Sequence, residues 1–184
     1  MPVFRLIAAA ALILALAGCA SLSGGGSGPG PGAPQPLKPI DAERFYSGRW
    51  LEVGRLPMDI TEGCVAAATA YGLRDDGKVD VRDTCHVDTP EGRERAISGV
   101  GTFVDPGANA KLRVRYLWLI VWEYWVLDRA DDYSWFISSD PSFDKLFIYT
   151  RDVPTQAELD ALVRRAGELG YDTSRLEFPE PLRD

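Results

Sequence analysis

The sequence predicts an all-β domain: an eight-stranded antiparallel up-and-down barrel with one C-terminal α-helix packed outside. From residue 48 onward, apolar and polar residues alternate with a period of two, and turn-forming residues interrupt this alternation at short intervals. Within this region, only the segment after residue 154 has helical periodicity. Eight successive strands of this kind close readily into a barrel, whose interior holds either packed side chains or one small ligand.

Four turn signals separate the strands that the alternation indicates. They are Asp75-Asp76-Gly77, Asp105-Pro106-Gly107, Asp131-Asp132 and Asp140-Pro141-Ser142. We interpret the acids in these segments as turn formers, and a metal-binding or catalytic pair is the alternative. The predicted strands are residues 48–56, 65–74, 78–85, 97–104, 111–117, 123–128, 133–138 and 145–150.

A helix is expected after the last strand. Thr155 and Glu158 have the spacing of a capping box at its start, and Gly170 is a typical end signal. One apolar stripe is suited to dock this helix on the sheet; it consists of Leu159, Leu162, Val163, Ala166 and Leu169. Residues 175–178 are expected to add a short edge strand.

The N-terminal part has the features of a targeting signal followed by a linker. Residues 6–17 are apolar, but these twelve residues are too few to span a bilayer, which needs about 20. The run ends in Leu16-Ala17-Gly18-Cys19, which resembles the bacterial lipobox, where the cysteine after the cleavage site becomes acylated. We therefore expect a lipoprotein signal peptide (1–18), a lipidated Cys19 with a Gly/Pro-rich tether (19–39), and the barrel domain (40–184).

The lipobox implies a location. Lipidation of Cys19 would anchor the chain to a membrane, and Ala20 after the cysteine favours the outer membrane of the bacterial cell envelope, with the domain facing the periplasm. An ordinary signal peptide that is cleaved elsewhere, with Cys19 incidental, is the alternative.

Composition excludes several functions. Twenty Lys+Arg against 27 Asp+Glu give a formal net charge of −7, which disfavours a nucleic-acid partner because phosphate binding needs a positive surface. His86 is the single histidine, so most His-based triads and multi-histidine metal sites are excluded. No glycine-rich phosphate loop is present, and we expect no metal or cofactor.

Two cysteines remain once Cys19 is assigned to lipidation. Cys64 and Cys85 form an even pair in an oxidising compartment, where disulfides persist. The hairpin turn at residues 75–77 places them on neighbouring antiparallel strands, nearly opposite one another. A disulfide is therefore expected, and two free buried thiols are the alternative.

The residues Gly48-Arg49-Trp50 at the first strand resemble the Gly-x-Trp signature of the lipocalins, most closely that of bacterial lipocalins and apolipoprotein D. The pattern of residues 99–103 is similar to the family at the fourth strand, and Arg151 matches its third motif. Residues 128–133 meet the second motif only in part. The resemblance implies structural roles for Gly48, Trp50 and Arg151, with the arginine lying over the tryptophan at the closed end of the barrel.

Alternation also predicts which side chains face the barrel interior. In each strand the apolar residues of the alternation are expected to be buried, so every second side chain faces inward. On the last strand, Lys145 is the inward residue furthest from the closed end. Gly99 and Gly101 would leave space beside Phe103. The candidate ligand-binding residues are Tyr71, Val81, Phe103, Leu112, Val114, Tyr116, Tyr124, Phe147, Tyr149 and Lys145. Such an interior suits an acyl chain with a hydrogen-bonding or anionic head, unless the rings fill the barrel completely.

These observations favour a non-enzymatic carrier or store of fatty acids or lysophospholipids. A barrel enzyme, an isomerase or hydrolase acting on lipids, is one alternative, and Glu52 and Asp83 are the inward acids that it would use. A protein-interaction module with a filled barrel is another. Residues 116–122 form an unusually apolar turn, which indicates a membrane-touching tip, a homodimer patch or two strands that run into each other.

Overall fold

The computed structural model describes residues 32–182, so the predicted signal peptide, Cys19 and most of the predicted tether lie outside the described residues. The elements in chain order are α1 Ala42–Phe45, β1 Ser47–Arg55, the 3-10 helix η1 Asp59–Thr61, β2 Cys64–Leu73, β3 Val79–Val87, β4 Arg93–Phe103, β5 Lys111–Tyr116, β6 Ile120–Arg129, β7 Trp135–Ser139, β8 Leu146–Thr150, α2 Gln156–Glu168, the 3-10 helix η2 Thr173–Arg175 and β9 Glu180–Pro181.

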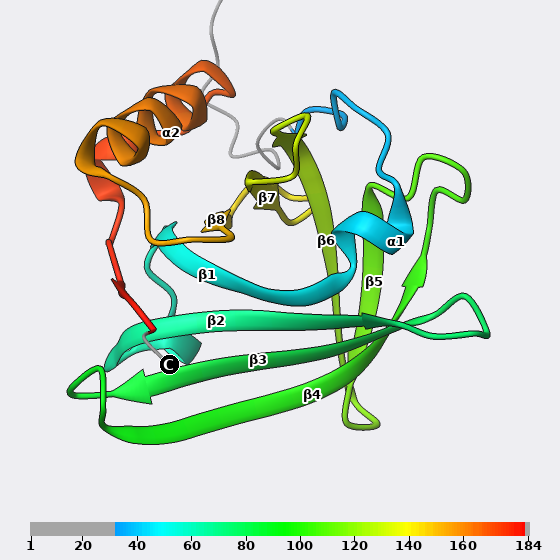
Figure 1. Ribbon diagram of the computed structural model, residues 1–184, viewed down its shortest axis with the longest axis horizontal. Helices are drawn as coiled ribbons and strands as arrows, with labels where there is room; N and C mark the ends of the chain where they lie inside the picture. Colours follow the sequence, from blue (N-terminus) through cyan, green and yellow to red (C-terminus); the bar gives the residue numbers. More distant parts are fainter. Residues whose placement is uncertain (1–31, 183–184) are drawn as a thin grey trace, which may run out of the picture.

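Strands β1 to β8 form a closed antiparallel barrel (Figure 1). Each strand pairs with the next in the chain, and β1 pairs with both β2 and β8, which closes the sheet. The eight predicted strands are all present, with bounds that differ by a few residues. The predicted fold class is therefore confirmed.

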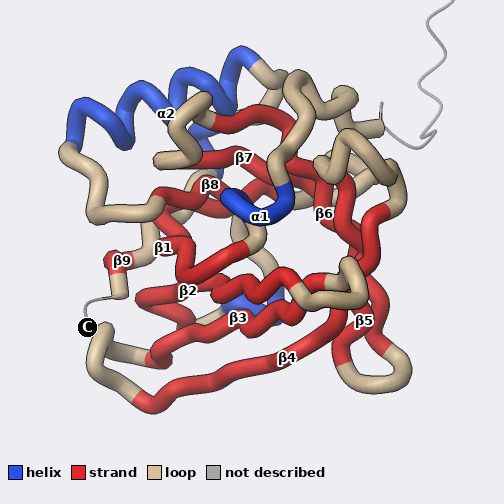
Figure 2. The backbone as a smooth tube through the Cα atoms, turned by 45° about the vertical axis from the view of Figure 1, so that its right-hand side comes forward, coloured by secondary structure: helices blue, strands red, loops and turns tan. Residues whose placement is uncertain are grey.

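The helix α2 lies outside the barrel, as predicted (Figure 2). Thr155 and Glu158 form the expected capping box, and Leu162 and Ala166 are its buried residues. They pack with outward-facing residues of the sheet, among them Leu127 and Ile148, to form a second apolar core. The first core lies inside the barrel and includes Trp50 at the closed end. No helix within residues 32–182 is long and apolar enough to cross a bilayer.

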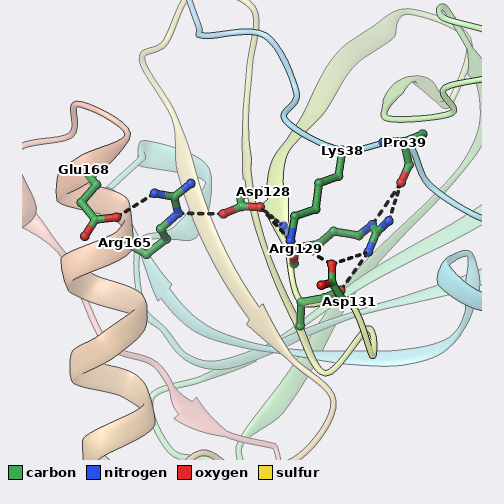
Figure 3. Close-up of polar contacts among 8 residues, drawn as sticks. Lys38, Pro39, Asp128, Arg129, Asp131, Arg165 and Glu168 are labelled. Carbon is green, nitrogen blue, oxygen red and sulfur yellow. Dashed lines mark hydrogen bonds and ion pairs between the residues drawn. The ribbon is translucent and has the colours of Figure 1, made fainter.

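Figure 3 shows how polar groups attach α2 and the N-terminal segment to the strand β6. The Asp128 carboxylate binds Nε of Arg165 in α2 at 2.7 Å and lies 3.9 Å from Nζ of Lys38. Arg129 donates to the carbonyl oxygen of Pro39. Although residues 128–133 depart from the family motif, they make a well-connected loop, in which the Tyr133 hydroxyl accepts from the backbone N–H of Asp41.

The last part of the predicted tether is attached to the barrel. The backbone N–H of Ala33 donates to Pro141, and that of Leu37 donates to Leu127. Ala33 is also buried. Residues 33–39, the end of the predicted tether, therefore contact the barrel through backbone hydrogen bonds at Ala33, Leu37 and Pro39.

Two terminal elements differ from the prediction. The short helix α1 was not predicted, because four residues are too few to show helical periodicity; the Asp41 side chain caps it. The predicted edge strand at residues 175–178 is misplaced. Glu177 makes only an isolated bridge to Arg55, and the added strand is β9, which runs parallel to β2.

The closed end of the barrel is built around Trp50, which is fully buried. The centroid of the Phe45 ring in α1 lies 5.2 Å from that of Trp50, and the Arg151 guanidinium lies 3.6 Å from the centroid of the Trp50 ring. Arg151 also donates to backbone carbonyls of α1 and β1, including that of Ser47. Gly48 has a φ of 64°, a conformation that favours glycine. This is the arrangement that the family resemblance implies for these residues.

Candidate ligand-binding site

A cavity of about 250 Å³ lies inside the open half of the barrel. Its wall includes Met58 and Ile60 from the β1–β2 connection and Trp122 from β6. Its lining is mainly apolar and aromatic, with a few polar groups. The lining residues used below are Glu52, Arg55, Thr69, Tyr71, Asp83, Arg95, Ile97, Tyr116, Ile120, Tyr124, Phe147 and Tyr149.

Five of the ten candidate ligand-binding residues line this cavity. They are Tyr71, Tyr116, Tyr124, Phe147 and Tyr149. Their inward orientation follows the alternation from which it was predicted. Contact with a ligand stays a prediction for these five.

Four of the candidate residues face inward but are not part of the cavity wall. Val81, Leu112 and Val114 are buried in the packed core of the closed half. The Phe103 ring packs against Tyr46 at a centroid distance of 5.2 Å. The structure therefore places these four side chains deeper in the barrel than the cavity wall, and their contact with a ligand stays a prediction.

Two glycines of β4 allow the neighbouring strand to pack closely against them. A Cβ added to Gly99 would lie 2.8 Å from a methyl group of Val114, and one added to Gly101 would lie 2.8 Å from Leu112. The expected gaps are thus occupied by side chains of β5, which approach closely because β4 lacks Cβ atoms there. The prediction that these glycines create lumen space is wrong.

Lys145 does not line the cavity. Its Nζ lies 3.3 Å from Oδ2 of Asp140, and it lies 5.5 Å from the centroid of the Trp122 ring. Asp140 also accepts from the backbone N–H groups of Asp144 and Lys145, which is the turn-forming role expected of this acid. The lysine is therefore held by its own loop at the rim.

The most polar part of the cavity wall is a cluster of two acids and several hydroxyls. Oδ1 of Asp83 accepts from Thr69 at 2.7 Å, and Oδ2 accepts from the Tyr116 hydroxyl at 2.5 Å. Tyr116 and Tyr124 hydroxyls are 3.1 Å apart. The Tyr149 hydroxyl donates to Oε2 of Glu52. Burial raises the pKa of both Glu52 and Asp83, because the charged carboxylate loses hydration.

Glu52 has a cationic partner that the sequence did not indicate. Nη1 of Arg55 lies 2.8 Å from its Oε1, and the same guanidinium binds Glu177 and the carbonyl oxygen of Cys64. The register of β1 against β8 shifts between Glu52 and Gly54. This bulge breaks the alternation, which is why strict parity could not place Arg55 beside the cavity.

The tyrosines of the cluster act as neutral hydrogen-bonding groups. Burial raises the pKa of Tyr116, Tyr124 and Tyr149 further above their ordinary range, so their hydroxyls stay protonated. Both inward acids required by the enzymatic alternative are present, but Glu52 is already ion-paired. The cluster is suited to bind and orient a polar group of a ligand.

The disulfide lies in the cavity wall. Cys64 and Cys85 are bonded, with their Cα atoms 5.5 Å apart, which confirms the predicted pair. Nη2 of Arg95 donates to the carbonyl oxygen of Glu62 at 2.7 Å and lies 3.0 Å from Sγ of Cys64. The crosslink thus fixes the β1–β2 connection against β3 at the rim. Residues 32–182 contain no group of three or more His, Cys, Asp or Glu side chains positioned to hold a metal.

An apolar loop projects from the same end of the barrel. Leu117, Trp118 and Leu119 join β5 to β6, and Trp118 is 79% exposed. Ile120, which follows them, is exposed and also lines the cavity. The apolar sequence at residues 116–122 is therefore a true turn between two strands, with an apolar surface continuous with the cavity.

The fold and the cavity define a class of protein: a small-ligand-binding antiparallel barrel, closed at one end by a tryptophan and open at the other. Residues 40–181 match the family model of the lipocalin-like domain. The chain belongs to the lipocalin family. Lipocalins generally bind or transport small hydrophobic molecules, and ligand binding is accordingly the general function of this chain.

Two relatives in sequence support this assignment, and one solved structure agrees with the fold. The outer membrane lipoprotein Blc of Vibrio cholerae is 29% identical over 151 residues, which is 79% of this chain and 86% of the relative. The temperature-induced lipocalin-1 of Arabidopsis thaliana is 30% identical over 150 residues, 76% of this chain and 78% of the relative. The structure of insecticyanin from the tobacco hornworm Manduca sexta has a similar fold, with a TM-score of 0.59 at 18% identity, covering 79% of this chain and 83% of that one.

Proposed function

We propose that this lipocalin is a membrane-anchored carrier or store of small hydrophobic ligands, such as fatty acids or lysophospholipids, in the bacterial cell envelope. The cavity of about 250 Å³ is the observation that carries the proposal. Its wall combines rings such as Phe147 and Trp122 with a few hydrogen-bonding groups, the usual composition of a small-molecule site.

The cavity volume limits how much of a lipid enters. At about 30 Å³ for each water-sized group, 250 Å³ holds roughly eight non-hydrogen atoms. Burial of eight methylenes at about 0.8 kcal/mol each contributes up to roughly 6 kcal/mol before the cost of association. A medium-chain amphiphile would be enclosed, whereas the remainder of a lysophospholipid would extend past the rim.

A displacement assay tests this proposal. The purified protein is titrated against a fluorescent medium-chain fatty acid, and Ile97→Trp in the cavity wall is compared with Val153→Trp, whose site is exposed and distant from the cavity. We expect the Ile97 variant to bind at least tenfold more weakly and the Val153 variant to bind like wild type. Equal binding by all three proteins would contradict ligand binding in the barrel.

The membrane anchor is the second part of the proposal. The lipobox ending in Cys19 and the similarity to an outer membrane lipoprotein support it. Ala33 binds the loop between β7 and β8, which lies at the same end of the strands as the apolar turn. Cys19→Ser should move the protein from the membrane fraction to the soluble periplasmic fraction. Its retention in the membrane fraction would contradict anchoring through Cys19.

The exposed loop favours a second function, the docking of a partner or a second copy. Trp118→Ser with Leu119→Ser removes most of its apolar surface. A partner or dimer function predicts that this variant loses self-association in sedimentation experiments while ligand affinity is retained. A wild-type protein that is monomeric at high concentration and binds the fluorescent ligand supports the carrier instead.

A further inference from the structure

The cavity contains an acid that lacks a cationic partner among the described residues. Asp83 accepts hydrogen bonds from two neutral hydroxyls, those of Thr69 and Tyr116. Within residues 32–182, no lysine, arginine or histidine nitrogen is within ion-pair distance of its carboxylate. Glu52, the other acid of the cluster, is neutralised by Arg55 at 2.8 Å. The negative charge available to a ligand is therefore that of Asp83.

The hydroxyls do not saturate this carboxylate. An ionised carboxylate offers about four acceptor positions, and Thr69 and Tyr116 occupy two of them. A charge removed from water without an opposite charge is unfavourable, and the raised pKa of Asp83 agrees with this. A group that brings positive charge and hydrogen-bond donors into the cavity would remove this penalty.

We propose that the cavity selects a small lipophilic amine, which enters head-first so that its ammonium group donates to Asp83 while its hydrocarbon part lies toward the rim. An ammonium has three donors and no acceptor, which matches a carboxylate with vacant acceptor positions. This inference rests on the proposed binding of a hydrophobic ligand inside the barrel, and it adds a ligand class whose head group matches Asp83.

The same geometry disfavours other head groups at this position. A carboxylate entering head-first would meet the charge of Asp83, and an alcohol would bring one donor without charge. A fatty acid would have to enter tail-first, with its head near Arg95 at the rim and its methyl end against the polar cluster. The amine is thus expected to bind most tightly when chain length is held constant.

A matched ligand series tests this inference. Octylamine, octanol and octanoate have about the size that the cavity holds, and each is titrated by calorimetry at pH 7 into the full-length protein. We expect octylamine to bind at least tenfold more tightly than the other two. Asp83→Asn should remove this preference. Asp80→Asn should preserve it, because Asp80 lies on the same strand but is exposed, with 63% of its side chain accessible.

The outcomes separate the inference from the proposed function. If octanol or octanoate binds wild type as tightly as octylamine, or if Asp83→Asn keeps the preference, the selection of amines is wrong while the carrier function stands. If none of the three compounds nor the fluorescent fatty acid binds, the proposed function fails first. The wild-type ranking decides the matter by itself should Asp83→Asn fail to fold.

Discussion

Replacement of Trp50 by alanine should destabilise the barrel strongly without a direct effect on the cavity. Trp50 is 0% exposed, and a buried aromatic side chain covers about 150–250 Å². At about 25 cal/mol per Å² this corresponds to roughly 4–6 kcal/mol, of which the remaining alanine retains a part. Measured costs of about 3–5 kcal/mol for such truncations agree. The substitution also removes the cation–π contact with Arg151, which lies 3.6 Å from the ring centroid, and this loss destabilises the barrel further.

Thermal unfolding followed by circular dichroism measures this effect. For a domain of this size, a loss of 3–5 kcal/mol lowers Tm by roughly 6–20 °C. Trp118→Ala is the matched control, because it removes the same side chain from a site that is 79% exposed, and its effect should stay within about 0.5 kcal/mol. Below its Tm, the Trp50 variant should bind ligand as wild type does, since Trp50 is not part of the cavity wall.

The reasoning about the closed end is refuted if the two tryptophan variants have the same Tm. It is also refuted if Trp50→Ala loses ligand affinity while remaining fully folded, because the tryptophan would then belong to the binding site.

Three further predictions concern the disulfide and the buried acids. Cys85→Ser removes a crosslink to Cys64 that spans 21 residues. Urea denaturation should show a free energy of unfolding about 3 kcal/mol lower than that of wild type, and a reductant should abolish this difference between the two proteins. Arg55→Met should lower the free energy of unfolding by about 3–5 kcal/mol, because it leaves Glu52 buried and unpaired. Adding Glu52→Gln should restore most of this stability. Simple additivity of the two substitutions in a double-mutant cycle would refute the coupling. Burial raises the pKa of Asp83 above 3.8, so the native state binds a proton more tightly than the unfolded state, and the wild type loses stability as pH rises through the raised pKa. The stability of Asp83→Asn relative to wild type should therefore increase from pH 4 to pH 8. A difference that stays constant over this range would contradict the prediction.

The strand alternation was sufficient to predict the barrel and the inward face of each strand. Its period of two is a direct consequence of backbone geometry, so Tyr71, Tyr116 and Tyr149 were placed correctly. The same rule fails where the backbone departs from regular pairing. The shift between Glu52 and Gly54 in β1 therefore concealed Arg55.

Depth along the barrel and the pairing of charges were decided only by the tertiary structure. The alternation predicts on which face of a strand a side chain lies, but not which neighbouring side chain fills the space beside it. Val114 occupies the space beside Gly99 because the two residues lie on adjacent strands. Likewise, the sequence contains Lys145 and Asp83 as inward candidates, but only the folded chain pairs the lysine with Asp140 and leaves the acid facing neutral hydroxyls. Local alternation determines orientation, whereas the partner of each charge depends on contacts between residues distant in the chain.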